Sequence, residues 1–283
     1  MICTVGIVGK YQEPKAALLV RWLVPWLEKR GKKVLVENGI FGSAAAPCTK
    51  EEMAPHADLI ISLGGDGTLL SIATLINNPD VPILGVNLSG LGFITEMAAN
   101  ELEPVLANAL QGDYRVEQRE VLEIRIESGD GRPYSFSVLN DAVIAKGSRS
   151  RLIDLETFVS GDYLCTYRAD GLIISTPTGS TAYSLAAGGP ILEPTLDAVV
   201  LSPICPHTLS NRPIVIPSTA TIKVTLRSFG DSVFMSPDGK HGVRLKNGDN
   251  IIARDSGVPI SLIKSPSRSY YEILRTKLKW GER

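Results

Sequence analysis

The sequence has little of what marks membrane, secreted or nucleic-acid-binding proteins. Lys and Arg total 29 and Asp and Glu total 30, so the net charge of −1 leaves no basic excess for a nucleic-acid backbone or an anionic lipid surface. Every apolar run is short, and Gly9 and Lys10 end the first one before it could span a bilayer or serve as a signal-peptide core. These absences predict a cytoplasmic protein with no nucleic-acid and no membrane partner.

Metal-binding and disulfide patterns are also missing. The 4 cysteines are far apart and form no Cys-x-x-Cys pair, which argues against a zinc cluster and a disulfide framework. No acidic cluster has metal-ligand spacing either, so we expect no metal ion held by the protein's own side chains.

The first part of the chain alternates strand and helix patterns. Short runs rich in β-branched residues at 4–8, 33–37, 58–63 and 81–87 are typical of parallel strands covered on both faces. Pro14 opens a helical pattern between the first two runs, and we expect Pro25 to kink or end that helix early. The pattern predicts a Rossmann-like parallel α/β domain over residues 1–99.

From Arg115 onward the periodicity drops to two. Residues 121–127 alternate apolar and charged side chains, and many further short runs follow, the last at 259–263, separated by Gly, Pro, Asp and Asn. This texture predicts a β-sandwich-like, β-rich domain over residues 100–267. The tail from Tyr270 to Trp280 is basic and amphipathic, and we expect residues 268–283 to return to the first domain.

The sharpest motif is Gly64-Gly65-Asp66-Gly67-Thr68, where a buried strand ends and a helix begins. Glycines and the N–H groups of a helix start suit phosphate oxygens, whereas a carboxylate repels them. Asp66 therefore fits this loop if it takes a proton from a nucleophile or holds a metal. The alternative is a glycine-rich turn in which Asp66 caps the helix.

Three further motifs follow in order. The turn from Asn87 to Phe93 is glycine-rich and follows another parallel strand, so Phe93 either stacks on a base or anchors the core. Asn140-Asp141 can read sugar hydroxyls or an adenine edge, or form an Asx turn. The block from Asp170 to Pro190 contains a hydroxyl-rich turn that leads into a short helix, which suits a polar ligand better than a simple cap.

Together, and in this order, the four motifs resemble the NAD kinase family, which phosphorylates the adenosine-ribose 2′-hydroxyl of NAD. The resemblance implies that Asp66 is the general base and that Gly67 helps to place the phosphates, with Gly64, Gly65 and Thr68 in the same phosphate loop. It implies that Asn140 and Asp141 hold the adenosine of NAD. The other NAD-binding residues that it implies are Phe93, Arg151, Arg168, Asp170, Thr181, Ala182, Tyr183, Ser184, Leu185, Ala186 and Lys240.

The same resemblance implies NAD, NADP and ATP as ligands, ATP or polyphosphate as donor, and Mg²⁺ carried by the nucleotide phosphates. It also implies a homodimer or homotetramer. Lys240 and His241 follow Asp238-Gly239, where some relatives have Gln, and this is a departure from the family pattern. Two alternatives stay open: a lipid kinase of the diacylglycerol or sphingosine kinase type, which shares the first motif, and a dinucleotide sensor without catalysis.

Overall fold

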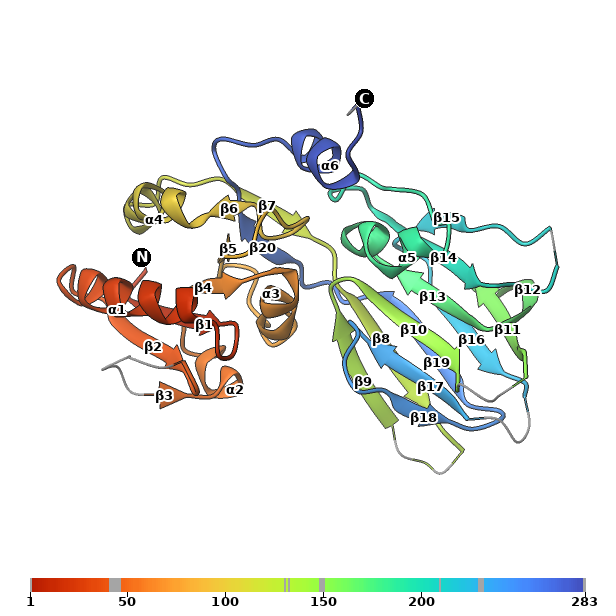
Figure 1. Cartoon of the computed structure of the whole chain (residues 1–283). Coiled ribbons are helices and arrows are strands. Elements are labelled where there is room, and N and C mark those ends of the chain that lie inside the picture. Colours follow the sequence, from red (N-terminus) through yellow and green to blue (C-terminus); the bar gives the residue numbers. More distant parts are fainter. Residues whose placement is uncertain are drawn as a thin grey trace. The chain divides into compact units, whose positions relative to one another are not determined.

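The protein forms two compact units. The computed structural model describes residues 2–40, 47–129, 131, 133–147, 151–208, 210–228 and 232–281. The first unit contains the residues up to Gln118 and those from Ile260 onward, and the second contains Arg119–Pro259 (Figure 1). Each unit has its own hydrophobic core. The predicted combination of an α/β unit and an all-β unit is confirmed.

The first unit is built on a largely parallel sheet. Over the described residues the strand order is β3-β2-β1-β4-β5-β20-β7, with β6 alongside β5. All six residues of β4 are buried, as expected for a parallel strand covered on both faces. The strands are Thr4–Gly9 (β1), Lys33–Glu37 (β2), Pro47–Cys48 (β3), Leu59–Gly64 (β4), Ile83–Asn87 (β5), Met97–Ala98 (β6), Val116–Arg119 (β7) and Ile260–Ile263 (β20).

Helices cover this sheet. Buried residues of α1 and α4 share one core with β1, β2, β4 and β5, whereas α3 packs on β4 and β5 outside that core. The helical segments are Pro14–Glu28 (α1), Lys50–Met53 (α2), Asp66–Ala73 (α3), a 3-10 turn Ala99–Glu101 (η1), Leu102–Leu110 (α4) and Tyr270–Leu278 (α6). Over the described residues, no helix combines the length and the apolar character needed to cross a membrane.

The expectation that Pro25 ends the first helix early is wrong. Helix α1 runs on to Glu28, three residues beyond the proline. Proline removes one backbone hydrogen bond from the helix, at a cost of roughly 3 kcal/mol. Leu23, Val24 and Leu27 on either side of it are buried in the core, so packing offsets that cost.

The two units divide the chain at other points than residues 99/100 and 267/268. Residues 100–118 belong to the first unit because α4 contributes Leu102, Val105 and Leu106 to its core. Residues 260–267 belong to it because β20 pairs in parallel with β5, with Leu262 opposite Ile83. The strand pattern at 259–263, which the sequence attributes to the β-rich domain, is therefore part of the parallel sheet.

The second unit is a sandwich of two sheets. Over the described residues the strand orders are β15-β14-β13-β10-β17-β18 and β12-β11-β16-β19-β8-β9, and inward-facing residues of both sheets form one core. The strands are Leu122–Glu127 (β8), Pro133–Val138 (β9), Asp141–Lys146 (β10), Ile153–Val159 (β11), Asp162–Ala169 (β12), Gly171–Ser175 (β13), Ala198–Ile204 (β14), Ile214–Pro217 (β15), Ile222–Leu226 (β16), Val233–Pro237 (β17), Val243–Leu245 (β18) and Asn250–Asp255 (β19). A 3-10 turn, Thr178–Thr181 (η2), and a short helix, Tyr183–Ala186 (α5), follow β13.

Sheet register brings three segments of the second unit to one place. Strand β10 lies between β13 and β17 and is antiparallel to both. Asp141 at its start faces Ser175 at the end of β13, and the next residue, Ala142, faces Pro237 at the end of β17. The turn before β10, the turn into η2 and the turn after β17 therefore meet at one end of this sheet.

The C-terminal tail is fixed to the first unit. A reciprocal capping box starts α6, because Glu272 N–H donates to Ser269 Oγ and Ser269 N–H donates to Glu272 Oε2. Arg268 Nη1 donates to Glu96 O at 2.6 Å and to Glu101 Oε2 at 3.0 Å. Ile273 and Leu274 are buried. The predicted return of the tail to the first domain is confirmed.

Truncating Ile273 tests how far the tail stabilises this unit. Ile273 has no exposed surface, so we expect Ile273→Ala to lower the free energy of unfolding by about 2–5 kcal/mol in urea titrations. Tyr271, which is 62% exposed on the same helix, supplies the control. Tyr271→Ala should change the free energy of unfolding by less than about 0.5 kcal/mol. Equal effects of the two variants would contradict a docked tail.

Candidate functional site

Asp66 is the first residue of α3, directly after β4 and Gly65. Its half-buried carboxylate accepts four hydrogen bonds from the loop after β5. Phe93 N–H donates to Oδ2 at 2.9 Å, while Ile94 N–H, Thr95 N–H and Thr95 Oγ1 donate to Oδ1 at 3.2, 2.9 and 2.8 Å. The side chain is thus held in one orientation from a neighbouring strand.

The two oxygens of this carboxylate differ in what they can still accept. Oδ1 takes three donors, which fills its capacity, whereas Oδ2 takes one. A carboxylate oxygen accepts about two hydrogen bonds through its lone pairs. Oδ2 is therefore the atom that can receive a proton from a ligand hydroxyl.

A short hydrogen-bond chain and one glycine shape this arrangement. Asn87 Nδ2 donates to Thr95 Oγ1 at 2.8 Å, which directs the Thr95 hydroxyl toward Asp66. Gly92 lies against this chain, and a Cβ there would overlap Asp66 Oδ1 and Thr95 Oγ1. The sequence marks this turn as glycine-rich but does not identify Asn87, Gly92 or Thr95 as partners of Asp66.

The other glycines of the first motif have different roles. A Cβ on Gly64 would overlap the Thr68 side chain, so Gly64 is needed for packing. A Cβ on Gly65 or Gly67 would meet nothing within 4 Å. Backbone N–H groups of the first helical turn lie beside this open space, where a phosphate would be favoured.

Phe93 lies at the same loop and is half-buried. Its ring faces the ammonium of Lys277 from α6, with Nζ 5.5 Å from the ring centroid. The backbone of Phe93 thus binds Asp66 while its side chain contacts the C-terminal helix. The sequence gives no signal for this contact.

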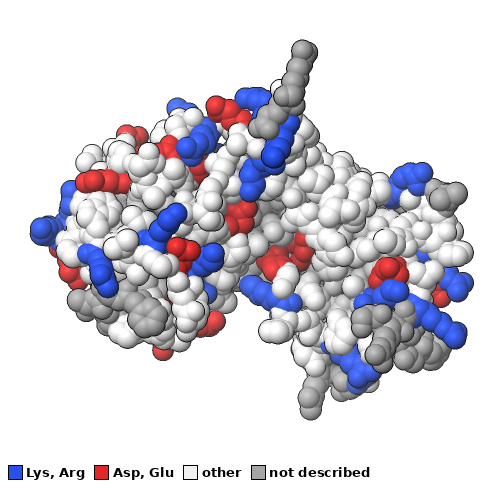
Figure 2. Space-filling view, viewed as in Figure 1, with Lys and Arg blue, Asp and Glu red and all other residues white. Residues whose placement is uncertain are grey.

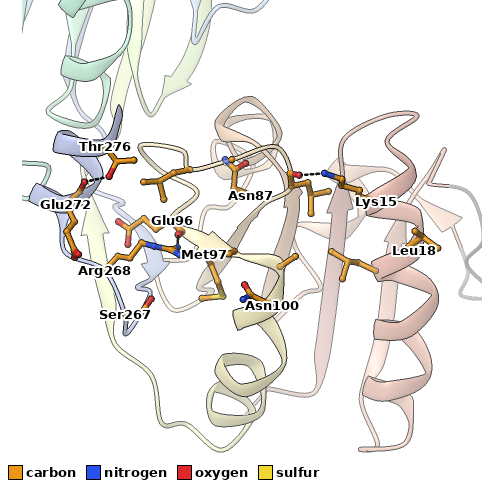
Figure 3. Close-up of a pocket in the computed structure, with 16 residues that line it drawn as sticks. Lys15, Leu18, Asn87, Glu96, Met97, Asn100, Ser267, Arg268, Glu272 and Thr276 are labelled. Carbon is orange, nitrogen blue, oxygen red and sulfur yellow. Dashed lines mark hydrogen bonds between the residues drawn. The ribbon is translucent and has the colours of Figure 1, made fainter. Parts of the chain in front are cut away.

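A cavity of about 1060 Å³ lies beside the loop after β5, with Leu88, Gly90 and Leu91 in its lining. Figure 3 shows the side chains that line it. It is lined by α1, by the end of β5 and the loop after it, by β6 and η1, and by α6 with the residues just before it. Lys15 Nζ donates to Leu88 O at 3.2 Å on the α1 side, and Thr276 Oγ1 donates to Glu272 O at 2.9 Å on the α6 side. None of the sequence-predicted site residues is among its lining residues.

In the second unit, the structure brings Asn140, Asp141 and Tyr183 together. Asp141 is 5% exposed at the start of β10, and Tyr183 N–H donates to its carboxylate. Asn140 Oδ1 is buried and has no hydrogen-bond partner among the described residues. Gly179 packs on Asn140, because a Cβ on Gly179 would overlap Asn140 O.

A residue that the sequence analysis leaves without a role, Asp238, completes this cluster. Its carboxylate accepts the N–H groups of Leu139, Asn140 and Asp141 at 3.0, 2.8 and 3.1 Å. Burial, followed by the negative charge of Asp238, raises the pKa of Asp141 to about 7. Asp238 follows β17, far from Asn140 in sequence, so its partners follow only from the sheet register.

The remaining predicted residues of the Asp170–Pro190 block lie on η2 and α5. Thr181 Oγ1 donates to Thr178 O, and the Ser184 hydroxyl bonds with Ser202 Oγ at 2.9 Å in the interior. Tyr183 is 47% exposed, whereas Ala182 and Leu185 are half-buried and Ala186 is exposed. The ring of Tyr183 is thus available to a ligand, whereas the Ser184 hydroxyl is engaged within the protein.

Four charged candidates lie outside the contacts described so far. Asp170 follows β12 and forms an ion pair with Lys146 at 3.0 Å. Arg168 is exposed on β12, Arg151 is exposed just before β11, and Lys240 is exposed in the turn after β17. Over the described residues, no hydrogen bond or ion pair joins Arg151 or Arg168 to Asn140 or Asp141, whereas the positive charge of Lys240 acts on Asp238.

The described residues contain no group of three His, Cys, Asp or Glu side chains that could hold a metal ion. Figure 2 shows acidic and basic side chains interspersed over the visible face of each unit. A metal ion held by protein side chains alone therefore does not fit these residues, and a cation at the site would need ligands from a bound molecule.

Comparison with protein-family models shows which family the chain belongs to. The model for the ATP-NAD kinase N-terminal domain matches residues 5–114, and the model for the ATP-NAD kinase C-terminal domain matches residues 139–265. The chain belongs to the NAD kinase family. Both matches include residues that the sequence analysis singled out.

Individual relatives agree with this assignment over the full length. The NAD kinase of Geotalea daltonii is 47% identical over 281 residues, and that of Geobacter metallireducens is 48% identical over 280 residues; each alignment covers 99% of both chains. Among solved structures, yeast NADH kinase complexed with NADH matches with a TM-score of 0.90 and 26% identity, covering 100% of this chain and 89% of that one. An NAD kinase from Archaeoglobus fulgidus in complex with ATP matches with a TM-score of 0.77 and 26% identity, covering 98% of each chain.

The close approach of Gly92 to Asp66 leads to a test in this NAD kinase family member. We expect Gly92→Ala to displace Asp66 or Thr95 and to lower the rate of NADP formation at least about 100-fold, since general-base catalysis is commonly worth 10²- to 10⁴-fold. Gly129 supplies the matched control, because a Cβ there meets nothing within 4 Å. Full activity of Gly92→Ala would show that the hydrogen bonds from the loop to Asp66 are not needed for NADP formation.

The raised pKa of Asp141 predicts a pH-dependent stability. In the unfolded chain an Asp titrates near about 3.9, so the folded state retains a proton that the unfolded state releases. The resulting stabilisation is fully present below pH ~4 and is lost as the pH rises through the folded pKa of about 7. Asp141→Asn should flatten this pH dependence in urea titrations between pH 5 and 8, whereas a change at exposed Asp162, Asp162→Asn, should leave it as in the unmodified protein.

Proposed function

We propose that the protein transfers the terminal phosphoryl group of ATP, or of inorganic polyphosphate, to the adenosine-ribose 2′-hydroxyl of NAD and releases NADP. Relatives named NAD kinase that are 47–48% identical over nearly the whole chain support the acceptor. The solved complex of the Archaeoglobus fulgidus enzyme with ATP supports a nucleotide donor, and the yeast complex with NADH supports a dinucleotide ligand.

The mechanism rests on one observation. Hydrogen bonds hold the Asp66 carboxylate in one orientation, and its Oδ2 can still accept a proton. A ribose hydroxyl is a weak nucleophile at neutral pH, and a carboxylate at hydrogen-bond distance typically accelerates its attack by 10²- to 10⁴-fold. In the proposed step, Asp66 Oδ2 takes the proton of the 2′-hydroxyl as the ribose oxygen bonds to the γ-phosphorus. The bond from that phosphorus to the bridging oxygen breaks, and ADP leaves with the bonding electrons.

The phosphate loop places the donor in this proposal. The open space beside Gly65 and Gly67 admits phosphate oxygens, and the N–H groups at the start of α3 favour negative charge there. We place a divalent cation such as Mg²⁺ on the donor phosphates, where it would spread their charge. Gly64 and the Thr68 side chain pack against each other and thereby shape the loop.

The second unit would bind the adenosine of NAD through Asn140 and Asp141. The buried Oδ1 of Asn140 lacks a partner among the described residues, and leaving such an acceptor unsatisfied costs about 1–3 kcal/mol. A ligand N–H or O–H would satisfy it, so we assign it to an adenosine donor group. The proposed NAD contacts also include Phe93, Arg151, Arg168, Asp170, Thr181, Ala182, Tyr183, Ser184, Leu185, Ala186 and Lys240.

We further propose a homodimer or homotetramer in the cytoplasm, on the family relationship alone. Light scattering coupled to size-exclusion chromatography measures the oligomeric state.

The central test is Asp66→Asn, which keeps the side-chain shape and removes the proton acceptor. We expect the rate of NADP formation from NAD, ATP and Mg²⁺ to fall by at least about 100-fold. NAD binding, measured by calorimetry, should change by less than about tenfold, because the variant alters one hydrogen bond to the ribose, worth about 0.5–1.5 kcal/mol, and leaves the proposed contacts of the second unit in place. Asp80→Asn is the control, since Asp80 is exposed in a surface turn, and it should leave the rate unchanged.

The same assay separates this function from the alternatives. Transfer to diacylglycerol or sphingosine without transfer to NAD would establish a lipid kinase. Tight NAD or NADP binding without transfer from ATP or polyphosphate would establish a sensor. Full activity of Asp66→Asn would remove the assigned base while leaving the substrate assignment intact.

A further inference from the structure

The turn that carries Asn140 is held by a carboxylate from the turn after β17, the strand that pairs with β10. Asp238 Oδ2 accepts Leu139 N–H, and Oδ1 accepts the N–H groups of Asn140 and Asp141. Three consecutive N–H groups thus point at one negative charge. Hydrogen bonds to a charged acceptor are about twice as strong as those between neutral groups.

The carbonyls of the same three residues are also engaged. Thr176 Oγ1 donates to Leu139 O at 2.6 Å, Thr176 N–H donates to Asn140 O at 2.9 Å, and Asp238 N–H donates to Asp141 O at 2.9 Å. Every backbone polar group from Leu139 to Asp141 therefore has a partner inside the protein. What this turn can offer a ligand is its side chains.

The backbone of Asp238 adopts a conformation that costs free energy, and the hydrogen bonds around it maintain that conformation. Its φ is +46°, in the left-handed region that non-glycine residues seldom adopt. Such a conformation persists where surrounding contacts determine it, and it is found preferentially at functional sites. Here the contacts are the three N–H groups and the bond from Asp238 N–H to Asp141 O.

We propose that Asp238 is a positioning residue for NAD, which fixes the Leu139–Asp141 turn so that the side chains of Asn140 and Asp141 are presented to the adenosine. This inference rests on the proposed function and deepens it, since Asp238 itself is not assigned a contact with NAD. Because these hydrogen bonds are all made within the protein and need no ligand atom, the turn is preorganised, and binding does not have to order it.

The test compares two carboxylates that make similar bonds in different places. Asp238→Asn replaces one acceptor oxygen by an amide that cannot accept, and Asp238→Gly removes the carboxylate while suiting the positive φ. Asp249 is the matched control: it is 2% exposed, and its carboxylate accepts Lys246 N–H at 2.8 Å, Ser128 Oγ at 2.9 Å and Gly129 N–H at 3.4 Å, in the turn before β19. Each variant is assayed as the full chain with NAD, ATP and Mg²⁺.

We expect both Asp238 variants to raise the KM for NAD roughly 10- to 100-fold, the range that loss of a charged hydrogen bond corresponds to. The kcat at saturating NAD should stay within about threefold, and so should the KM for ATP, because Asp66 and its loop are untouched. Asp249→Asn should lower the melting temperature without changing the KM for NAD. A KM for NAD that changes no more in the Asp238 variants than in Asp249→Asn would overturn the proposal.

The pH profile gives a readout that lost stability alone would not move. The negative charge of Asp238 acts on Asp141, and Lys240 is the cation that acts on Asp238. Asp238→Asn removes the negative charge that helps to raise the pKa of Asp141, so the inflection of kcat/KM for NAD should move to lower pH. An inflection that stays in place, or that moves equally in Asp249→Asn, would contradict the positioning role.

These outcomes are distinct from a failure of the proposed function. If the unmodified protein forms no NADP from any donor, the kinase assignment fails. If it forms NADP and Asp238→Gly leaves the KM for NAD unchanged, the positioning role fails while the kinase assignment stands.

Discussion

The first unit depends on the hydrogen bonds between the Asp66 carboxylate and the loop from Phe93 to Thr95. These bonds join the end of β4 to the residues after β5, so two neighbouring loops at the carboxyl ends of a parallel sheet become one rigid structure. A carboxylate placed by its helix alone would keep rotamer freedom. Here four hydrogen bonds from the loop remove that freedom and hold the carboxylate in one orientation.

The second unit uses the same physical device for a different purpose. Asp238, like Asp66, accepts several consecutive N–H groups from a segment distant in sequence. In the first unit the held group is the carboxylate, and the loop orients it. In the second unit the carboxylate does the holding, and the oriented groups are the neighbouring side chains. Both cases show how buried backbone donors, which must find acceptors, can be used to orient reactive groups.

The sequence predicted those parts of the fold whose signals are local. The aliphatic run of β4 followed by Gly64 and Gly65 identified a buried strand that ends in a glycine-rich turn, and the alternation over residues 121–127 identified a sandwich strand. Strand β20 was misassigned because its four residues resemble any short β-rich run, whereas its pairing with β5 joins segments about 180 residues apart. The early helix end expected at Pro25 was wrong, because the packing of Leu23, Val24 and Leu27 in the core outweighs the low helix propensity of proline.

Only some residues of the candidate site could be singled out from the sequence. Asp66, Asn140 and Asp141 stand in motifs whose residue types state their chemistry. Asn87 ends β5, Thr95 lies in the loop that follows it, and Asp238 follows β17. Their hydrogen bonds to residues of the candidate site depend on which distant strands pair. Sequence spacing contains no information on which turn meets which, so these partners required coordinates.

The insertion of one unit within the other has a consequence for biosynthesis. Strand β20 completes the parallel sheet beside β5, yet the ribosome makes it after the whole sandwich. Until then, β5 of the nascent α/β unit is paired by β6 at Val86 and Asn87 but lacks its β20 partner at Ile83, and an incompletely paired strand edge is a place where chains can associate incorrectly. The strands of the sandwich are contiguous along the chain, so the sandwich can fold before β20 is made. Strand β20 then pairs with β5 of the parallel sheet.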